Sequence, residues 1–154
     1  NLFYMKGDNT IQTLIIEGKP MNMNSGKIEN KGVEFDINYK ASQNFDFSTN
    51  YSFLDMEYKL TASPEHKLYV SGNFTSGRWS ISSGIQYIGN LFTSVAPEMK
   101  KNSFTLWNCR AHYQATNRMK LFVKGENLLN QSYEINDGYP MPGTTAFGGI
   151  MIEM

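Results

Sequence analysis

The sequence has little cysteine, little charge imbalance and no long apolar run. Cys109 is the single cysteine among 154 residues, so no disulfide can form within the chain. The cysteine count therefore does not indicate whether the protein lies in an oxidising or a reducing compartment. No stretch approaches the roughly 18 consecutive apolar residues of a transmembrane helix. The formal net charge is +0, from 14 basic and 14 acidic residues. Because nucleic-acid-binding proteins carry a basic excess, we predict no nucleic-acid partner.

Residue spacings typical of metal sites and catalytic sites are also absent. The two histidines are His66, expected in a solvated loop, and His112, expected on the polar face of a strand. No His-x₃-His, Cys-x₂-Cys or His-Glu-x₂-His spacing occurs in the sequence. Cys109 falls on a predicted apolar face, where a thiol behaves as a small hydrophobic group. We therefore predict no enzyme activity, no bound metal and no cofactor.

What the sequence has in abundance is alternation of apolar and polar residues. In residues 45–53, FDFSTNYSF, the odd positions are apolar or β-branched and the even positions are small and polar. A period of two gives a strand with one apolar face and one polar face. Aromatic residues make up 14% of the chain, which also favours strands. We expect almost no helix. The same alternation recurs in 33–39, 67–74, 79–87, 103–115, 119–129 and 149–154, and residues 1–13 are expected to form one more strand.

The expected connections between strands alternate between short and long. Gln43-Asn44, Gly77-Arg78 and residues 116–118 are tight-turn sequences, whereas the other connections are longer and polar. In an up-and-down antiparallel sheet, alternate turns lie at the same end. One end with short turns and one with long loops is typical of transmembrane β-barrels. The expected breaks are at about 14–27, 41–44, 59–66, 76–78, 91–102, 116–118 and 130–143.

Three features favour a bilayer over a soluble core. The strands are longer than the usual five or six residues of soluble proteins, and roughly 9–11 residues cross a bilayer. Trp79 and Tyr87 lie about 26 Å apart along one strand, near the spacing of two aromatic girdles. The polar face carries carboxylates, amides and lysines, as a watery lumen would. The sequence predicts an all-β, antiparallel up-and-down transmembrane β-barrel, complete with eight strands or part of a larger one.

Several segments resemble TonB-dependent outer-membrane receptors. Residues 125–133, GENLLNQSY, and 138–143, GYPMPG, resemble the penultimate strand and last loop of that family. Residues 30–35, NKGVEF, resemble its recurrent Gly-Val-Glu strand start, and 50–53 and 64–67 resemble other family segments. The end of the chain resembles an outer-membrane assembly signal, although Met154 stands where an aromatic residue is usual.

The resemblance implies a particular architecture and role. Residues 1–154 would form one segment, about eight C-terminal strands of a barrel of about 22 strands, with the plug domain and the other strands outside this sequence. The whole protein would import a scarce nutrient, such as an iron–siderophore, haem, cobalamin or a glycan, across the outer membrane of a Gram-negative bacterium. The implied partners are outer-membrane lipid, the plug domain with a TonB-type energy-coupling protein, the barrel-assembly machinery and the nutrient.

Two alternatives to the receptor remain open from the residues alone. One is a self-contained eight-stranded outer-membrane barrel acting as an adhesin, pore or structural protein. The other is a soluble lipocalin-like barrel that binds a small ligand.

The candidate functional residues fall into three groups. Because loops on a rigid scaffold commonly carry recognition, the predicted ligand contacts are Met21, Met23, Phe92, Glu98, Tyr133, Tyr139 and Met141. The predicted lumen-facing residues are Glu34, Asp36, Lys67, Gln86, Arg110, Lys124 and Glu126. The predicted assembly signal is Gly149, Ile152 and Met154.

Overall fold

The computed structural model describes residues 1–8, 11–16, 19–24 and 27–153. Among these residues, no helix is long and apolar enough to cross a membrane. The described strands are β1 (Leu2–Asp8), β2 (Ile11–Ile16), β3 (Lys19–Asn24), β4 (Lys27–Lys40), β5 (Phe45–Met56), β6 (Pro64–Ser76), β7 (Trp79–Ser94), β8 (Lys100–Thr116), β9 (Met119–Glu126) and β10 (Thr145–Ile152).

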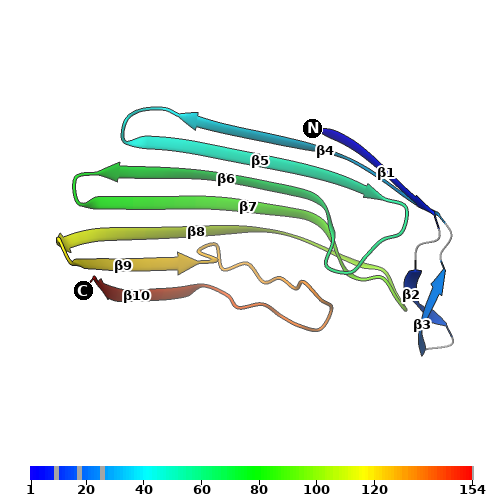
Figure 1. The fold of residues 1–154 in the computed structure, drawn as a ribbon. Coiled ribbons are helices and arrows are strands. Elements are labelled where there is room, and N and C mark those ends of the chain that lie inside the picture. Colours follow the sequence, from blue (N-terminus) through cyan, green and yellow to red (C-terminus); the bar gives the residue numbers. More distant parts are fainter. Residues whose placement is uncertain (9–10, 17–18, 25–26, 154) are drawn as a thin grey trace.

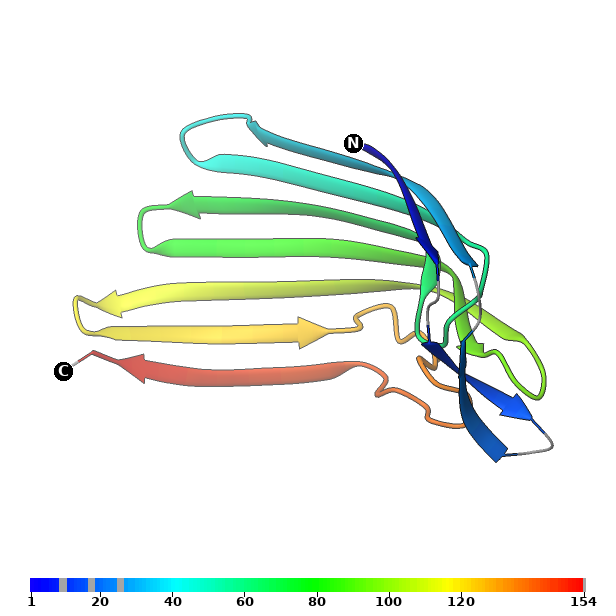
Figure 2. The same cartoon turned by 45° about the vertical axis from the view of Figure 1, so that its right-hand side comes forward.

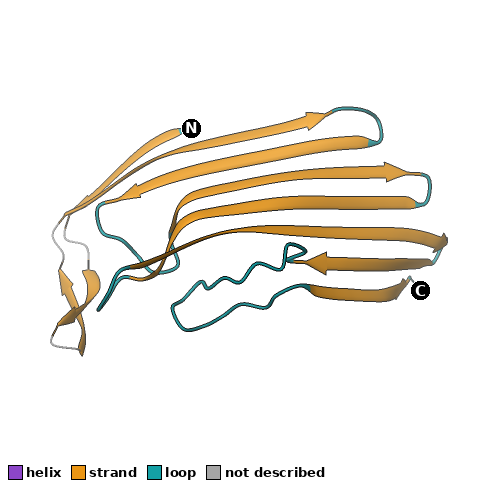
Figure 3. Ribbon diagram, turned by 180° about the vertical axis from the view of Figure 1, so that it is seen from behind, coloured by secondary structure: helices purple, strands orange, loops and turns teal. Residues whose placement is uncertain are grey.

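Eight of these strands form one antiparallel sheet in the order β1-β4-β5-β6-β7-β8-β9-β10 (Figure 1). The tight turns β4–β5, β6–β7 and β8–β9 lie at one end, and the longer connections lie at the other (Figure 3). We call the second end the loop end. The predicted all-β, up-and-down architecture is confirmed. The sheet stays open within the described residues, because β1 and β10 form its two edges and do not pair with each other.

Strand register places the apolar residues of neighbouring strands together. Phe45 pairs with Phe74, which pairs with Ile81, so these three side chains form one row on the same face. The apolar face is open: 51% of Phe35 and 47% of Ile85 is exposed. The opposite face is polar and its side chains are mostly half-buried. The period-two alternation therefore yields two chemically distinct faces along the whole sheet.

The main buried apolar cluster lies at the loop end. Ile88, Leu91 and Phe104 are buried there, and Tyr133 and Ile135 from the connection after β9 pack against them. Ile88 pairs with Phe104, and both lie on the polar face of the sheet. The cluster thus attaches the last long connection to the wall formed by β7 and β8.

The expected single strand over residues 1–13 is wrong. Strand β1 ends at Asp8, and Ile11–Ile16 pairs with Lys19–Asn24 in a separate two-stranded sheet. Residues 11–16, IQTLII, are rich in β-branched residues, which favour a strand. The predicted connection at 14–27 is therefore partly a β-hairpin, which projects from the loop end of the main sheet (Figure 2).

Two further loop boundaries differ from the prediction. Strand β7 continues to Ser94 and β8 begins at Lys100, so the expected connection over 91–102 is much shorter. Strand β6 begins at Pro64, which places His66 within a strand. Proline is tolerated at the first residue of a strand, because its missing N–H then removes no central ladder bond.

Candidate functional site at the loop end and on the polar face

Four segments build the loop end: the β2–β3 hairpin, residues 57–63, residues 95–99 and residues 127–144. The predicted ligand contacts all belong to this end. Some of these residues are packed against the sheet and others are exposed to solvent.

Asn127 organises the last connection. The residue is 5% exposed and has a φ of 49°, a left-handed conformation that asparagine tolerates better than most residues. Its Nδ2 donates hydrogen bonds to the carbonyl oxygens of Gln131 (2.9 Å) and Pro142 (3.1 Å), and its Oδ1 accepts one from the Gln131 N–H (2.9 Å). Its own N–H donates to Oδ1 of Asn108 at 2.9 Å. One side chain therefore holds both ends of residues 127–144 together.

Tyr133 lies inside this folded connection. Its ring packs on Phe104, with 4.3 Å between ring centroids. Further along, the Asp137 N–H donates to the Thr93 carbonyl oxygen at 3.0 Å, and the Lys100 Nζ donates to Oδ2 of Asp137 at 2.7 Å. The connection is thus attached to β7 and β8 by aromatic packing, by a backbone hydrogen bond and by an ion pair.

Phe92 was predicted to lie in an exposed connection, and this is wrong. It belongs to β7 and its side chain is 0% exposed. The Lys101 Nζ lies 4.7 Å from the ring centroid and the Lys59 Nζ lies 5.6 Å from it. Glu65 Oε1 lies 3.6 Å from the Lys59 Nζ and 3.3 Å from the Lys101 Nζ. The two lysines therefore cover the ring, which is not available at the surface.

The other predicted contacts are open to solvent. Tyr139 is 73% exposed and Met141 is 37% exposed, although both belong to the anchored connection. Glu98 is exposed in residues 95–99. On β3, Met21 is 50% exposed and Met23 is 41% exposed. The surface of the loop end therefore carries aromatic, thioether and carboxylate groups that a ligand can reach.

The predicted lumen-facing residues share one face of the sheet. Glu34 and Lys67 both pair with Ser52, which places them in one row. Arg110 pairs with Lys124, whose Nζ forms an ion pair with Glu126. The remaining members, Asp36 and Gln86, fall on the same side by register.

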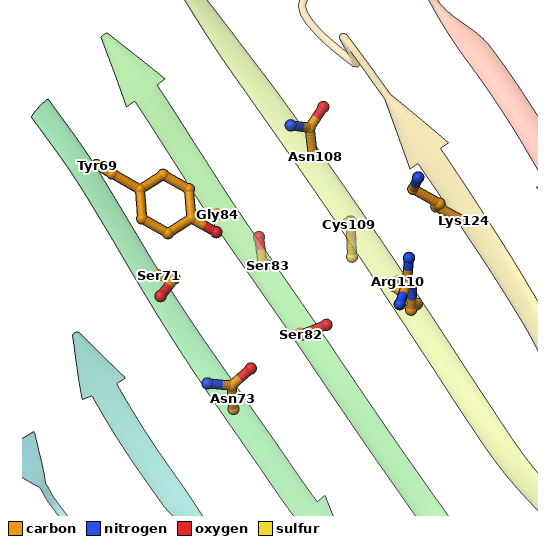
Figure 4. A pocket seen from close by; sticks show the side chains of 10 residues that line it. All are labelled: Tyr69, Ser71, Asn73, Ser82, Ser83, Gly84, Asn108, Cys109, Arg110 and Lys124. Carbon is orange, nitrogen blue, oxygen red and sulfur yellow. The ribbon is translucent and has the colours of Figure 1, made fainter. Parts of the chain in front are cut away.

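A shallow hollow marks the middle of this polar face, lined by residues of β6 to β9 (Figure 4). Tyr69 extends from β6 toward Gly84 of β7 in that view. Any side chain at position 84 would collide with the Tyr69 hydroxyl, so glycine permits this approach. Arg110 and Lys124 line the same hollow, which gives it two cationic groups.

His66 was expected in a solvated loop and instead lies on the apolar face of β6. It pairs with Phe53, and its Nδ1 lies 2.9 Å from the Tyr51 hydroxyl in a hydrogen bond. Its ring centroid lies 5.0 Å from that of Phe53. The neighbouring aromatic rings and the hydroxyl give the imidazole a partly covered site, which the Pro-Glu-His sequence alone does not reveal. His112 falls on the polar face, as predicted, since it pairs with Ser80.

The end of the chain keeps the predicted alternation as far as it is described. Gly149 lies beneath the Phe122 ring, where a Cβ would come within 2.7 Å of that ring. Ile152 points from the apolar face and is 70% exposed. Met154 lies outside the described residues.

The described residues contain no group of three or more His, Cys, Asp or Glu side chains arranged to hold a metal ion. Sequence reasoning missed Asn127 as an organising residue, although it lies inside the segment that carries the resemblance. It also missed the contact between Glu65 and Lys101, which lie 36 residues apart and whose proximity has no signal in the local sequence.

An antiparallel meander with one apolar and one polar face is the pattern expected of the wall of a β-barrel. A sequence model described as TonB dependent receptor-like, beta-barrel matches residues 1–128, so the chain belongs to that family.

Solved receptor structures share this fold. The copper transporter OprC is similar at 15% identity and a TM-score of 0.79, over 99% of this chain and 28% of that one. The ferripyoverdine receptor of Pseudomonas aeruginosa is similar at 15% identity and a TM-score of 0.72, over 98% of this chain and 24% of that one. The ferric-catecholate import receptor Fiu of E. coli K12 is similar at 18% identity and a TM-score of 0.71, over 97% of this chain and 24% of that one. The chain therefore spans about a quarter of the length of these receptors.

Proposed function

We propose that this chain is the C-terminal barrel segment of an outer-membrane receptor that imports a scarce nutrient with energy from a TonB-type coupling protein. The observation that carries the proposal is the eight-stranded sheet with an exposed apolar face and a polar opposite face, in a chain of the TonB-dependent receptor family. On this proposal, lipid covers the apolar face and the polar face lines the lumen. The loop end is then extracellular.

The two free sheet edges support a larger barrel. Within the described residues, the outer sides of β1 and β10 have no strand partner. In hydrocarbon every backbone N–H and C=O needs a partner, so a membrane sheet must close. We infer that further strands of the same receptor close it, with a plug domain inside against Glu34, Asp36, Arg110 and Lys124. We also infer that Gly149, Ile152 and Met154 of the sequence serve recognition by the barrel-assembly machinery. An exposed edge strand can pair with an edge strand of that machinery.

The transported ligand belongs to the classes that such receptors carry: an iron–siderophore, haem, cobalamin, a glycan or a metal ion. The structural neighbours include a copper transporter and receptors for ferric ligands. Tyr139, Met141, Glu98 and the two methionines of β3 are the exposed groups that we assign to ligand capture at the loop end.

Energised uptake tests this function. The full-length receptor, expressed in a Gram-negative host without competing receptors, is offered a panel of labelled nutrients. We expect one nutrient to accumulate in cells, and we expect accumulation to stop when the energy-coupling protein is deleted while surface binding persists. Accumulation that continues unchanged without the coupling protein would contradict the proposal.

A pair of lysine substitutions tests which face meets lipid. Ile85 and Gln86 are neighbours on β7, and Ile85 is 47% exposed on the apolar face. A lysine facing lipid near the midplane costs about 2–4 kcal/mol, whereas a lumen lysine remains hydrated. We expect Ile85→Lys to reduce the amount of receptor assembled in the outer membrane and Gln86→Lys to leave it unchanged. Equal assembly of both variants would refute this assignment of faces.

A further inference from the structure

Two neighbouring turns each carry an exposed arginine at the end of the sheet opposite the loop end, which we call the turn end. Arg78 lies in the β6–β7 turn and Arg118 lies in the β8–β9 turn. Because β7 pairs with β8, these two turns are adjacent (Figure 1). The turn end therefore presents two guanidinium groups from neighbouring segments.

Hydrogen bonds fix the backbone of both turns. The Arg78 carbonyl oxygen accepts a bond from the Gln114 N–H at 2.8 Å, and the Arg78 Nη1 donates to the Ala115 carbonyl oxygen at 3.4 Å. The Arg118 N–H donates to the Thr116 Oγ1 at 3.3 Å. The Arg78 guanidinium is thus held against the end of β8, the strand that leads into the turn of Arg118.

The two guanidinium groups differ from the other basic groups in their surroundings. Within the described residues, neither Arg78 nor Arg118 forms an ion pair with a carboxylate, whereas the Lys120 Nζ of β9 lies 2.9 Å from Glu153 Oε1. At the loop end, the lysines that each form an ion pair with a carboxylate are Lys59, Lys100 and Lys101. The two arginines of the turn end therefore carry positive charge that is complementary to an anionic partner.

An aromatic pair ends the apolar face beside these arginines. Trp79 follows Arg78 directly and pairs with Tyr113, with 4.8 Å between the ring centroids. Trp79 is 50% exposed. Tryptophan and tyrosine form girdles at the boundary between membrane and water, because one part of each ring is apolar and another is polar. Since one strand residue spans about 3.3 Å, Arg78 lies just beyond this boundary on the proposed function.

We propose that Arg78 and Arg118 bind the phosphodiester headgroup of an anionic phospholipid in the leaflet at the turn end, with its acyl chains along Trp79 and Tyr113. This inference rests on the proposed function, which places lipid on the apolar face. A guanidinium group donates parallel N–H bonds to two oxygens of one phosphate. The charged groups adjoin exposed aromatic rings, and this combination suits a ligand with an anionic head and an apolar tail better than a free phosphate ion.

Lipid preference tests the site. The purified full-length receptor, in neutral detergent micelles, is titrated with phosphatidylglycerol or with phosphatidylcholine of the same acyl chains, and bound lipid is measured by native mass spectrometry. We expect phosphatidylglycerol to bind more tightly, and Arg78→Gln with Arg118→Gln to weaken its binding by about tenfold. Lys100→Gln with Lys101→Gln removes the same charge at the loop end and is the matched control. Equal binding of both lipids by the unaltered receptor, or an equal loss in the control, would overturn the proposal.

Chemical protection gives a second measurement, on the receptor without any substitution. Its arginines are modified with phenylglyoxal in the presence of phosphatidylglycerol, phosphatidylcholine or inorganic phosphate, and the modified peptides are identified by mass spectrometry. We expect phosphatidylglycerol to protect Arg78 and Arg118 and to leave the reactivity of Arg110, on the polar face, unchanged. Protection by inorganic phosphate to the same extent would assign a site for free phosphate and overturn the lipid proposal.

The lipid site and the proposed function fail separately. If neither lipid test supports the site while a nutrient still accumulates through the coupling protein, only the lipid site is wrong. If phosphatidylglycerol protects Arg78 and Arg118 in a receptor whose uptake does not depend on the coupling protein, only the proposed energised transport is wrong.

Discussion

The β2–β3 hairpin and residues 127–144 connect strands at the same end of the sheet, yet they are held in opposite ways. Residues 127–144 fold back onto β7 and β8, through the hydrogen bonds of Asn127 and the packing of Tyr133 on Phe104. The hairpin satisfies its backbone by pairing with itself, and its strand β3 is exposed throughout.

The two segments therefore differ in how firmly their contacts hold them at the loop end. Ordering a chain segment costs conformational entropy, and buried contacts must offset that cost. Residues 127–144 have such contacts and act as part of the barrel wall. Strand β3 is exposed along its described length, and segments with few buried contacts open most readily. On the proposed function, we expect ligand capture at the hairpin and at exposed side chains of the anchored connection, such as Tyr139.

The largest effect on this comparison is expected from Asn127→Ala. The change removes the partners of the Gln131 N–H and of the Gln131 and Pro142 carbonyl oxygens, and a buried unpaired polar group costs about 1–3 kcal/mol. Alanine is also less favourable than asparagine at a φ of 49°. We expect residues 127–144 to exchange their amide hydrogens as fast as the hairpin, which hydrogen-exchange mass spectrometry measures. Asn136→Ala, at an exposed position of the same connection, is the control. Equal protection in both variants would show that Asn127 does not hold this connection.

Sequence alone was sufficient for the features that depend on local pattern. Alternation predicted the two faces of β5 and β7, and Gly77-Arg78 predicted a tight turn. The anchoring of the last connection could not be predicted in this way, because Phe104 of β8 and Tyr133 of the connection after β9 meet only once the sheet has formed. The burial of Phe92 likewise depends on Lys59 and Lys101, which come from other segments. Apolar residues near a strand end have the same local pattern whether they face a ligand or a neighbouring segment.

A pair of tyrosine substitutions sharpens the comparison within the anchored connection. Tyr133→Ala removes the ring that packs on Phe104, and the loss of a half-buried aromatic ring is expected to cost about 1–3 kcal/mol. Tyr139→Ala, at a side chain that is 73% exposed, is expected to change stability by less than about 0.5 kcal/mol. We expect both changes to weaken ligand capture, Tyr133→Ala through disorder of the connection and Tyr139→Ala through a lost contact. Thermal unfolding and ligand affinity, measured on the same samples, separate the two. A destabilised Tyr139→Ala variant would show that this side chain belongs to the wall.

The smallest effect is expected at the ion pair between Lys100 and Asp137. The pair is short, at 2.7 Å, but both side chains are more than 40% exposed, at 49% and 41%. Exposed pairs contribute about 0.2–1 kcal/mol and weaken with salt. A double-mutant cycle with Lys100→Met and Asp137→Asn, read from thermal unfolding in low and high salt, measures the coupling. Since the Asp137 N–H still donates to Thr93 in every variant, the connection should stay attached. A coupling energy above about 2 kcal/mol would mean that charge, and not packing on Phe104, distinguishes the anchored connection from the hairpin.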